Sequence, residues 1–455
     1  MVTAPFEWGT EAFTPEVTGD ILQCTSQSGL QGQINLSDIL GVLPGEDSSS
    51  SHTVLFLVKP EGHNHGDSIA AVGHLEKTVI SCLPSSLTQF LVKVPEYLQH
   101  SEPVQVVVSV KSGTCQAQTI FQDLVEPLLT QLSVKYEVHE TKSTQTITEL
   151  CESRFLERAR AGTPQTIVLL SGDGGVVNIV DYFYRHTQSV QTPPHIALIP
   201  CGTGNALACS IGSRTGPSSG LKSLIRGTPT PIPIFATKLS PGSQMIVDEG
   251  RQKVPLGDPN ASHQTLYGSV TVSWGIHAAL VADSDTTEYR KFGNERFKIA
   301  GMKLLHPPDG SAPHKFKGNV TYSERDDQTG EVSEKTFEGD EHMYLLASLV
   351  SRLEYNFVVS PKSEPLDGSM WFMGWGPMSG EEATRLVVLA YKGGLHVDDE
   401  AVTYAKFEKL RIDFKEDSEH WRRICVDGNI IAVEKDGWLE LTKEPRQLLN
   451  VIKPH

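Results

Sequence analysis

Two glycine-rich turns carry the residues of this chain that are best suited to chemistry. The first, Ser171-Gly-Asp-Gly-Gly175, follows the apolar run at residues 166–170, and the second, Pro200-Cys-Gly-Thr-Gly-Asn205, follows the apolar run at residues 195–199. Glycine lets the backbone approach a phosphate closely, and the N–H groups at a helix N-terminus attract anions. Because each turn precedes an expected helix, the two turns together predict a phosphate-binding crevice. The residues that would line it are Ser171, Gly172, Gly174, Gly202, Thr203, Gly204 and Asn205.

Asp173 stands between two glycines of the first turn. An ionised carboxylate cannot donate a hydrogen bond to a phosphate, so this side chain suits a general base, or a ligand of Mg²⁺ that neutralises a transferred group. The alternative is that the glycines only make a tight turn and that Asp173 caps the next helix. The second turn, one strand and one helix later along the chain, favours the functional interpretation. Neither turn matches the P-loop pattern or the dinucleotide-binding pattern G-x-G-x-x-G.

Alternating strands and helices are expected to position the two turns. The predicted strands are residues 104–110, 132–140, 166–170 and 195–199, and the predicted helices lie near residues 120–129, at residues 149–160 and after each turn. Continuous apolar runs such as residues 166–170 are typical of parallel strands buried on both faces. This order predicts a parallel sheet covered by helices on both sides, with Pro127 kinking its helix or ending it early.

The length of 455 residues exceeds what one core supports, and the changes in pattern along the chain predict three regions. Residues 1–98 carry short alternating runs and are expected to form a small β-rich module. Residues 103–228 are expected to form an α/β catalytic nucleotide-binding domain. Residues 229–445, where strands separated by Gly and Pro dominate, are expected to form a β-rich substrate domain. Within that domain, the polar residues 241–262 are expected to form a flexible insertion.

Composition and charge exclude several classes of protein. The formal net charge of −16 repels phosphate polymers, so a nucleic-acid partner is not expected, and membrane contact would be local and apolar. The chain carries no run of 18 apolar residues, its start lacks a signal-peptide pattern, and Val2 excludes N-myristoylation. The seven cysteines are odd in number and form no C-x-x-C pair, which indicates a reducing compartment. We therefore expect a cytoplasmic protein that associates peripherally with intracellular membranes.

The sequences of both turns resemble those of a known family. Ser171-Gly-Asp-Gly174, together with Pro200-Cys-Gly-Thr-Gly-Asn-Ala-Leu-Ala208, resembles the catalytic domain of the diacylglycerol, ceramide and sphingosine kinase superfamily. Further motifs resemble the sphingoid long-chain-base kinases within it: Ser273-Trp-Gly-Ile276, Glu288-Tyr-Arg-Lys-Phe-Gly-Asn-Glu-Arg-Phe297, Leu366-Asp-Gly-Ser369 and Val426-Asp-Gly-Asn429. The resemblance covers about residues 103–445. It implies a Rossmann-like α/β domain with a parallel sheet, followed by a β-sandwich lipid-binding domain.

The resemblance also implies roles for individual residues. The family transfers the γ-phosphate of ATP, with Mg²⁺, to a lipid hydroxyl, and its general base falls on Asp173. The implied metal ligand is Asp427. The implied substrate ligands are Ser171 and Asp283, with Asp285 as the competitor because two extra residues separate Trp274 from Tyr289. The implied nucleotide ligands are Ser109, Lys111, Ser112, Gly113, Thr141, Gly172, Gly174, Asn178, Gly202, Thr203, Gly204, Asn205, Arg290, Arg296, Asp427, Gly428 and Asn429.

Several family positions are altered in this chain. Asn178 and Asn429 stand where the family has Glu, and Ser109 stands where its first nucleotide loop has Asn. An amide oxygen can coordinate Mg²⁺ but carries no charge, so the ion would be held more weakly. Arg290 and Arg296 are six residues apart, so both reach the phosphates only if a helix there breaks near Gly293.

The expected activity is phosphorylation of a sphingoid long-chain base, because a carboxylate at Asp283 would favour a cationic amine. The alternatives are a diacylglycerol or ceramide kinase, a pseudokinase that binds nucleotide or lipid without transfer, and an NAD kinase, against which the regions around Trp274 and Tyr289 argue. His63 and His65 are interpreted as surface residues of a loop rather than metal ligands. The apolar stretch with Met302, Leu304 and Leu305 is expected to enclose the alkyl chain or to pack in the core.

Overall fold

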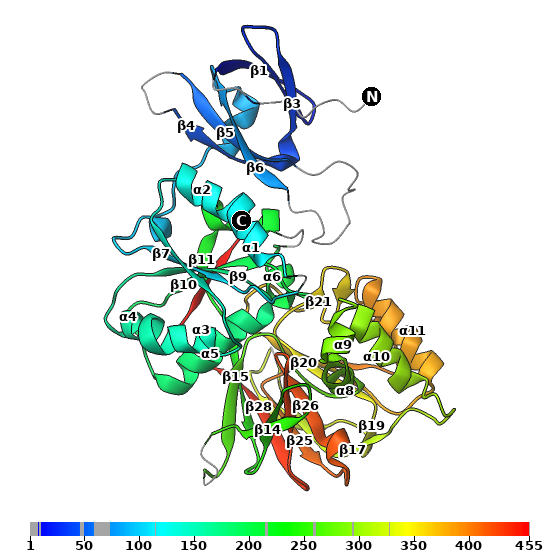
Figure 1. Cartoon of the computed structure of the whole chain (residues 1–455). Helices are drawn as coiled ribbons and strands as arrows, with labels where there is room; N and C mark the ends of the chain where they lie inside the picture. The colour runs from blue at the N-terminus through cyan, green and yellow to red at the C-terminus, as the bar shows by residue number, and fades with distance from the viewer. Residues whose placement is uncertain are drawn as a thin grey trace.

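The computed structural model describes residues 8, 11–45, 50–58, 73–113, 115–213, 217–257, 261–293, 295–326 and 328–454. Figure 1 shows an N-terminal β-module at one end, an α/β domain in the middle and a β-rich domain at the other end. This arrangement confirms the predicted fold class. His63 and His65 lie outside the described residues. None of the helices in the described ranges has the length and apolar character needed to span a membrane.

The N-terminal module is a sheet with the strand order β3-β2-β1-β6-β5-β4. Its side chains alternate between buried and exposed, as in β3, so that one face packs on a small core around Phe13 and Leu22. Its strands are β1 (Ala12–Thr18), β2 (Ile21–Thr25), β3 (Gln31–Asn35), β4 (Ile39–Pro44), β5 (His52–Val58) and β6 (His74–Ile80). The predicted β-rich N-terminal module is therefore confirmed.

The α/β domain is built on a sheet with the strand order β11-β29-β10-β9-β7-β8. Its parallel strands are β7 (Val104–Val108), β8 (Tyr136–Glu140), β9 (Thr166–Ser171), β10 (His195–Pro200) and β29 (Asn450–Lys453). The helices that cover it are α1 (Ala117–Ile120), α2 (Glu126–Gln131), α3 (Thr146–Leu150), α4 (Leu156–Arg160), α5 (Asp173–His186), α6 (Ala206–Ser210) and α7 (Pro217–Arg226). The apolar run of β9 is buried throughout, as the doubly covered strand requires. Pro127 lies at the start of α2, directly after a π-helical turn at Phe121–Val125.

The end of the chain returns to this sheet. β29 pairs in parallel with β10, and β11 (Thr228–Pro231) pairs with β29 in the antiparallel direction. In Figure 1 the red C-terminal strand accordingly lies among the strands of the middle domain. The chain thus enters and leaves the β-rich domain through neighbouring strands.

The β-rich domain is a sandwich, as predicted. One sheet has the order β15-β12-β28-β25-β17-β18, with β19 paired to β17, and the facing sheet has the order β14-β13-β27-β26-β16-β20-β23-β24. Apolar side chains from both sheets, including Trp274, Phe372 and Phe414, form one core between them. The strands of the first sheet are β15 (Gln264–Gly268), β12 (Ile234–Leu239), β28 (Trp438–Glu444), β25 (Lys409–Phe414), β17 (Phe316–Arg325), β18 (Val332–Thr336) and β19 (Glu341–His342). Those of the second are β14 (Gln252–Pro255), β13 (Gln244–Val247), β27 (Asn429–Ala432), β26 (Arg423–Val426), β16 (Thr271–Gly275), β20 (Tyr344–Ser348), β23 (Met370–Trp375) and β24 (Thr403–Phe407).

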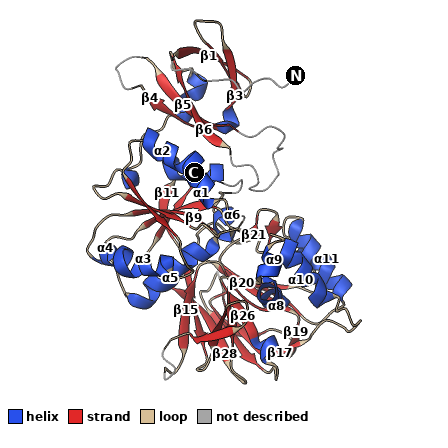
Figure 2. Cartoon of the chain, viewed as in Figure 1, coloured by secondary structure: helices blue, strands red, loops and turns tan. Residues whose placement is uncertain are grey.

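Helices gather on one side of the sandwich, next to the α/β domain (Figure 2). They are α8 (Ile276–Ser284), α9 (Thr287–Arg290), α10 (Glu295–Leu305) and α11 (Gly380–Tyr391). A short hairpin of β21 (Arg352–Glu354) and β22 (Phe357–Val358) lies between them and α6.

The prediction that residues 241–262 form a flexible insertion was wrong. β13 and β14 form an antiparallel hairpin there, and β13 pairs with β27 of the second sheet. The segment is polar because β14 is an exposed strand at the edge of that sheet, not because it lacks structure.

Candidate active site

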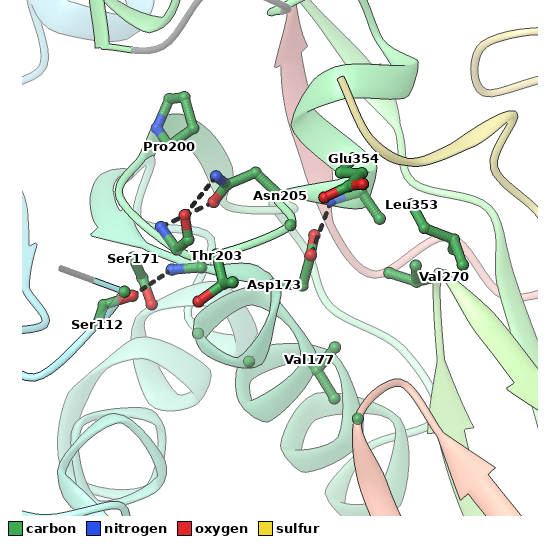
Figure 3. Close-up of a pocket in the computed structure, with 18 of the residues that line it drawn as sticks. Ser112, Ser171, Asp173, Val177, Pro200, Thr203, Asn205, Val270, Leu353 and Glu354 are labelled. Atoms are coloured by element: carbon green, nitrogen blue, oxygen red, sulfur yellow. Dashed lines mark hydrogen bonds between the residues drawn. The ribbon is translucent and has the colours of Figure 1, made fainter. Parts of the chain in front are cut away.

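Turns from neighbouring strands of the α/β sheet meet at their carboxyl ends. The hydroxyl of Ser112, in the turn after β7, accepts a hydrogen bond of 2.9 Å from the Gly172 N–H in the turn after β9. In the turn after β10, Asn205 closes a small ring, because its Oδ1 accepts from the Gly202 N–H at 2.9 Å and its Nδ2 donates to the Gly202 carbonyl at 2.8 Å. Figure 3 shows these bonds side by side. The turns thus form one rigid backbone surface.

The glycines in these turns are required by close backbone contact. A Cβ on Gly202 would lie 2.4 Å from the Gly172 Cα, and a Cβ on Gly113 would lie 2.4 Å from the Cys201 carbonyl oxygen. Gly113 also has a φ of +52°, which L side chains rarely adopt. Any side chain at either position would push the turns apart. The phosphate-binding surface formed by the turns at residues 112–113, 171–175 and 200–205, called the glycine cradle below, therefore depends on glycine.

Asp173 is the first residue of α5, and its carboxylate faces the start of α6. It accepts hydrogen bonds from the N–H groups of Ala206 at 2.7 Å and Leu207 at 3.0 Å. Burial raises the pKa of the Asp173 carboxyl, while these N–H donors oppose the shift. The carboxylate therefore caps α6 rather than its own helix. It is at the same time a half-buried group whose raised pKa suits a general base.

Asp427 occupies a tight hairpin turn between β26 and β27. Its φ of +48° and that of Gly428, +87°, fit the Asp-Gly pair of a type I′ turn. The carboxylate accepts hydrogen bonds from the N–H groups of Ser269, Val270 and Thr271. Burial raises the pKa of Asp427 to about 7, and the Asp173 carboxylate adds to the rise, against the effect of the N–H donors. The charge of Asp173 therefore acts on Asp427 across the same cleft.

The raised pKa of Asp427 predicts a pH-dependent stability. At a pH between the ordinary aspartate pKa of about 4 and the folded value of about 7, the Asp427 carboxyl is protonated in the folded state and ionised in the unfolded state. The contribution of Asp427 to stability is therefore complete below about pH 4 and is lost as the pH rises to about 7. We expect the melting temperature of the wild type to fall more steeply between pH 5 and about pH 7.5 than that of Asp427→Asn. If calorimetry showed that the melting temperatures of the two proteins fall equally with pH, the raised pKa of Asp427 would be refuted.

The helical segment that carries Arg290 and Arg296 is broken near Gly293, which is the condition for both side chains to reach the phosphates. α9 ends at Arg290, Gly293 has a φ of +53°, and α10 begins at Glu295. The break turns both Arg290 and Arg296 toward the Asp285 carboxylate, at 2.8 Å and 3.5 Å. Both guanidinium groups line the cleft described next, where a phosphate could reach them.

A continuous cleft of about 3740 Å³ extends from the N-terminal module along the α/β domain to the helices of the β-rich domain. All the predicted site residues line it except Asp283: Ser109, Lys111, Ser112, Gly113, Thr141, Ser171, Gly172, Asp173, Gly174, Asn178, Gly202, Thr203, Gly204, Asn205, Arg290, Arg296, Asp427, Gly428 and Asn429. Asp283 points elsewhere, to an ion pair of 2.8 Å with Arg423. Its competitor Asp285 lies in the cleft, between the two arginines.

One arm of the cleft is apolar. Its walls come from α8, α10, α11 and the β21–β22 hairpin, and they include Ile276, Leu280, Met302, Leu305, Phe357, Trp375, Val387 and Val388. Met302 and Leu305 line this arm, while Leu304 and Leu305 also pack with the sandwich core. The stretch therefore contributes both to the cleft wall and to the core. An arm of this kind suits an alkyl chain.

The residues that line the cleft fit a nucleoside triphosphate and one hydrated Mg²⁺. Backbone N–H groups of the glycine turns, with the cations of Lys111, Arg290 and Arg296 on the cleft wall, suit phosphate groups. Within the described ranges, no cluster of three or more His, Cys, Asp or Glu side chains could enclose a metal ion. Mg²⁺ does not require one, because it commonly takes one or two carboxylates together with substrate phosphates and water. Asp427, which lines the cleft, is the carboxylate that would hold it.

Glu354 is one of the acidic cleft residues that sequence reasoning missed. It lies at the end of β21, lines the cleft and is labelled near Asp173 in Figure 3. No motif marks Glu354, since it lies about 150 residues after the second glycine turn and reaches the site only through the packing of β21 on α6.

Comparisons with known proteins agree with this geometry. The family described as "Diacylglycerol kinase catalytic domain" matches residues 103–237. Sphingosine kinase 1 of Caenorhabditis elegans is 24% identical over 48% of this chain and 42% of its own length. Human sphingosine kinase 1 is 24% identical over 51% of this chain and 54% of its own length. Sphingoid long chain base kinase 5 of Saccharomyces cerevisiae is 26% identical over 30% of this chain and 20% of its own length. The chain thus spans about half, or less, of these relatives.

Solved structures share the fold of the larger part of the chain. A putative diacylglycerol kinase from Bacillus anthracis has a TM-score of 0.52 at 16% identity, over 77% of this chain and 95% of its own. The match extends well beyond the α/β domain, so the β-rich domain shares the fold too. Residues 103–237, which hold the turns around Asp173 and Asn205, thus match the diacylglycerol kinase catalytic domain family.

Proposed function

We propose that this protein is an ATP-dependent lipid kinase that transfers the γ-phosphate to the primary hydroxyl of a long-chain lipid. The observation that carries the proposal is the position of Asp173, a half-buried carboxylate where a glycine cradle meets an apolar arm of the same cleft. A phosphate donor and an alkyl chain can therefore be bound at once, with a base between them. The family of residues 103–237 and the names of the relatives support the same reaction class.

In this reaction, the chain itself supplies positioning, charge and a base. Asp173 accepts the proton of the lipid hydroxyl, and the two N–H groups of α6 hold its carboxylate in place. The glycine turns fix the phosphates in line, and Arg290 and Arg296 offset the charge that develops on them. Bound ATP with Mg²⁺ supplies the phosphoryl group and further charge neutralisation. Such a reaction needs little else from the protein.

Among acceptors, we propose a sphingoid long-chain base as the preferred substrate. The resemblance of residues 273–276 and 288–297 to sphingoid base kinases supports this choice, as do the names of the relatives, which are sphingosine and sphingoid base kinases. Diacylglycerol and ceramide are the alternatives, since they also present a primary hydroxyl above alkyl chains. Because these lipids reside in membranes, we propose that the protein acts peripherally at a membrane surface in the cytoplasm.

Lipid-stimulated release of ADP tests the proposed activity. The full chain is incubated with ATP, Mg²⁺ and detergent-dispersed sphingosine, phytosphingosine, ceramide or diacylglycerol. We expect one of these lipids, a sphingoid base in the first place, to stimulate ADP release well above the level with detergent alone. Equal ADP release with and without every lipid would exclude a lipid kinase.

A pseudokinase is the second candidate, and a specific observation favours it. Asn178 and Asn429 line the cleft at positions where the family resemblance implies Glu, so the metal region carries less negative charge. A pseudokinase would be stabilised by nucleotide without forming product.

The kinase proposal makes a distinct prediction for Asn429. If the missing charge only weakens metal binding, Asn429→Glu lowers the Mg²⁺ concentration for half-maximal activity by roughly tenfold, equivalent to about 1.4 kcal/mol. Activity is titrated with Mg²⁺ at fixed ATP for the wild type and the variant. An unchanged Mg²⁺ profile would show that residue 429 does not act on the metal.

A further inference from the structure

The apolar arm of the cleft contains three rings with polar atoms that the proposed reaction does not use. His277, in the first turn of α8, lines the cleft together with Tyr344 and Trp375, which are direct partners on the neighbouring strands β20 and β23. The Tyr344 and Trp375 rings stack with 4.1 Å between centroids, and the His277 ring meets the Tyr344 ring edge-on at 5.9 Å. These three rings form one continuous surface, called the aromatic wall below.

Two buried polar atoms of the aromatic wall have no partner in the part of the chain that the structure describes. Trp375 is 3% exposed, and its Nε1 donor makes no hydrogen bond. Tyr344 is 6% exposed, and its hydroxyl has no hydrogen-bond partner among the described residues either. Buried donors and acceptors are almost always paired in native proteins, because leaving them unpaired is costly. Two such atoms on one wall of a cleft therefore point to a bound ligand that pairs with them.

The aromatic wall is polar but carries no charge. Burial lowers the pKa of His277 to about 4 and raises the pKa of Tyr344, so the imidazole and the phenol are both neutral at neutral pH. Ser273 Oγ and His277 Nδ1 share a hydrogen bond of 2.8 Å, which leaves Nε2 as the ring nitrogen that can bind a ligand. The wall therefore suits a neutral group that forms hydrogen bonds, and not an ion.

The position of His277 places the wall at the reacting end of the arm. The Thr271 N–H, on β16, donates to the Asp427 carboxylate at 2.6 Å. Ser273, which binds His277, follows two residues later on the same strand, about 7 Å along it. Ser273 is also paired with Cys425, two residues before Asp427 on β26. A polar group that the alkyl chain carries close to its reacting hydroxyl would therefore meet His277.

We propose that His277, Tyr344 and Trp375 form a subsite for a hydroxyl group carried by the alkyl chain of the acceptor near its head, so that the protein prefers a hydroxylated long-chain base to an unsubstituted one. The subsite rests on the proposed lipid kinase function, because that function places a lipid in the arm. A hydroxyl both donates and accepts, so it matches a wall with an indole donor, a phenol and an imidazole nitrogen. A chain without the hydroxyl covers these atoms with methylene groups and leaves them unpaired, and a site of this kind rejects such an analogue.

Two lipids that differ by one hydroxyl test the subsite. Phytosphingosine carries a hydroxyl at carbon 4 that sphinganine lacks. We expect the kcat/KM of the wild type to be at least about tenfold higher for phytosphingosine, equivalent to about 1.4 kcal/mol. His277→Leu removes both ring nitrogens and should bring the ratio of the two kcat/KM values to within about twofold of one. His277→Gln keeps a hydrogen-bonding group at the end of the side chain and should restore most of the preference.

Tyr344→Phe and its control test the other side of the subsite. Tyr344→Phe removes one hydroxyl and keeps the ring that stacks on Trp375, so the preference for phytosphingosine should fall at least about threefold. Tyr322→Phe makes the same change at a tyrosine of the sandwich core, outside the described cleft lining, and should leave the preference unchanged. A wild-type ratio near one, or a ratio that both His277→Leu and Tyr344→Phe leave unchanged, would overturn the subsite.

Direct binding separates failure of the subsite from failure of the proposed function. Phytosphingosine and sphinganine each displace a fluorescent sphingoid base from the full chain and the same variants, without ATP. Equal affinities for the two lipids in a protein that phosphorylates both would overturn the subsite and leave the kinase function standing. A preference for phytosphingosine that depends on His277, in a protein that transfers no phosphate, would uphold the subsite and reject the kinase function. Displacement by neither lipid would overturn the subsite.

Discussion

Replacing Asp173 with Asn is expected to lower lipid phosphorylation by about 10²- to 10⁴-fold, the usual contribution of a general base. The amide cannot accept the proton of the lipid hydroxyl, and the half-buried carboxylate, whose pKa is raised by its surroundings, is the group that can. Because the phosphates are held by glycine turns rather than by Asp173, the affinity for ATP should change little. The test compares initial rates of the wild type and Asp173→Asn at saturating lipid, and the ATP affinity of both proteins is measured separately.

The control for Asp173→Asn is a second half-buried aspartate on the same helix, Asp181. The Asp181 carboxylate accepts from the Tyr267 N–H at 3.0 Å and pairs with Arg185 at 3.0 Å, so it ties α5 to β15. Burial raises its pKa as it does that of Asp173. Asp181→Asn should lower the melting temperature, while kcat stays within about tenfold of the wild type, about 1.4 kcal/mol. Equal losses of kcat in both variants would mean that Asp173 supports the structure of the site and is not the general base.

Replacing Gly202 with Ala is expected to disable the phosphate cradle. The new Cβ would lie 2.4 Å from the Gly172 Cα and 2.9 Å from Asn205 Oδ1, so the two glycine turns must separate. Overpacking of this kind typically costs about 1–3 kcal/mol. The displaced N–H groups also no longer converge on the phosphates. We expect ATP affinity to fall by more than about tenfold, together with a lower melting temperature.

Gly174→Ala is the matched control for Gly202→Ala, because it makes the same chemical change nearby. No heavy atom lies within 4 Å of a Cβ built at Gly174, which is already helical at the start of α5. The melting temperature of this variant should equal or slightly exceed that of the wild type, since Ala favours a helix over Gly. If Gly202→Ala kept the melting temperature and ATP affinity of the wild type, close contact between the two glycine turns would not be needed for stability or for ATP binding.

The catalytic side of the site could be predicted from the sequence because its signals are local. An apolar run followed by a glycine turn and a helix defines the position of Asp173 and, one unit later, of Asn205. The Asp-Gly pair at Asp427 likewise marks a hairpin turn. The carboxyl ends of neighbouring parallel strands lie at one edge, so the two glycine turns had to meet.

The parts that could not be predicted depend on contacts between distant segments. β29 joins the parallel sheet although more than 200 residues separate it from β11, and no local pattern encodes that partner. Glu354 enters the cleft because β21 packs on α6, and Asp283 leaves it because Arg423, from β26, takes its carboxylate. The polar edge hairpin of β13 and β14 resembles a loop in composition, because an exposed strand needs few apolar residues.

The central claim is that the cleft transfers the γ-phosphate of ATP to a lipid hydroxyl. The most direct measurement is mass spectrometry of the lipid after incubation with γ-¹⁸O-labelled ATP, Mg²⁺ and detergent-dispersed sphingosine, with the wild type and Asp173→Asn run in parallel. The account predicts a labelled phosphate on the primary hydroxyl with the wild type and a trace at most with the variant. Unlabelled lipid alongside clear ATP binding, or equal labelling by both proteins, would contradict it.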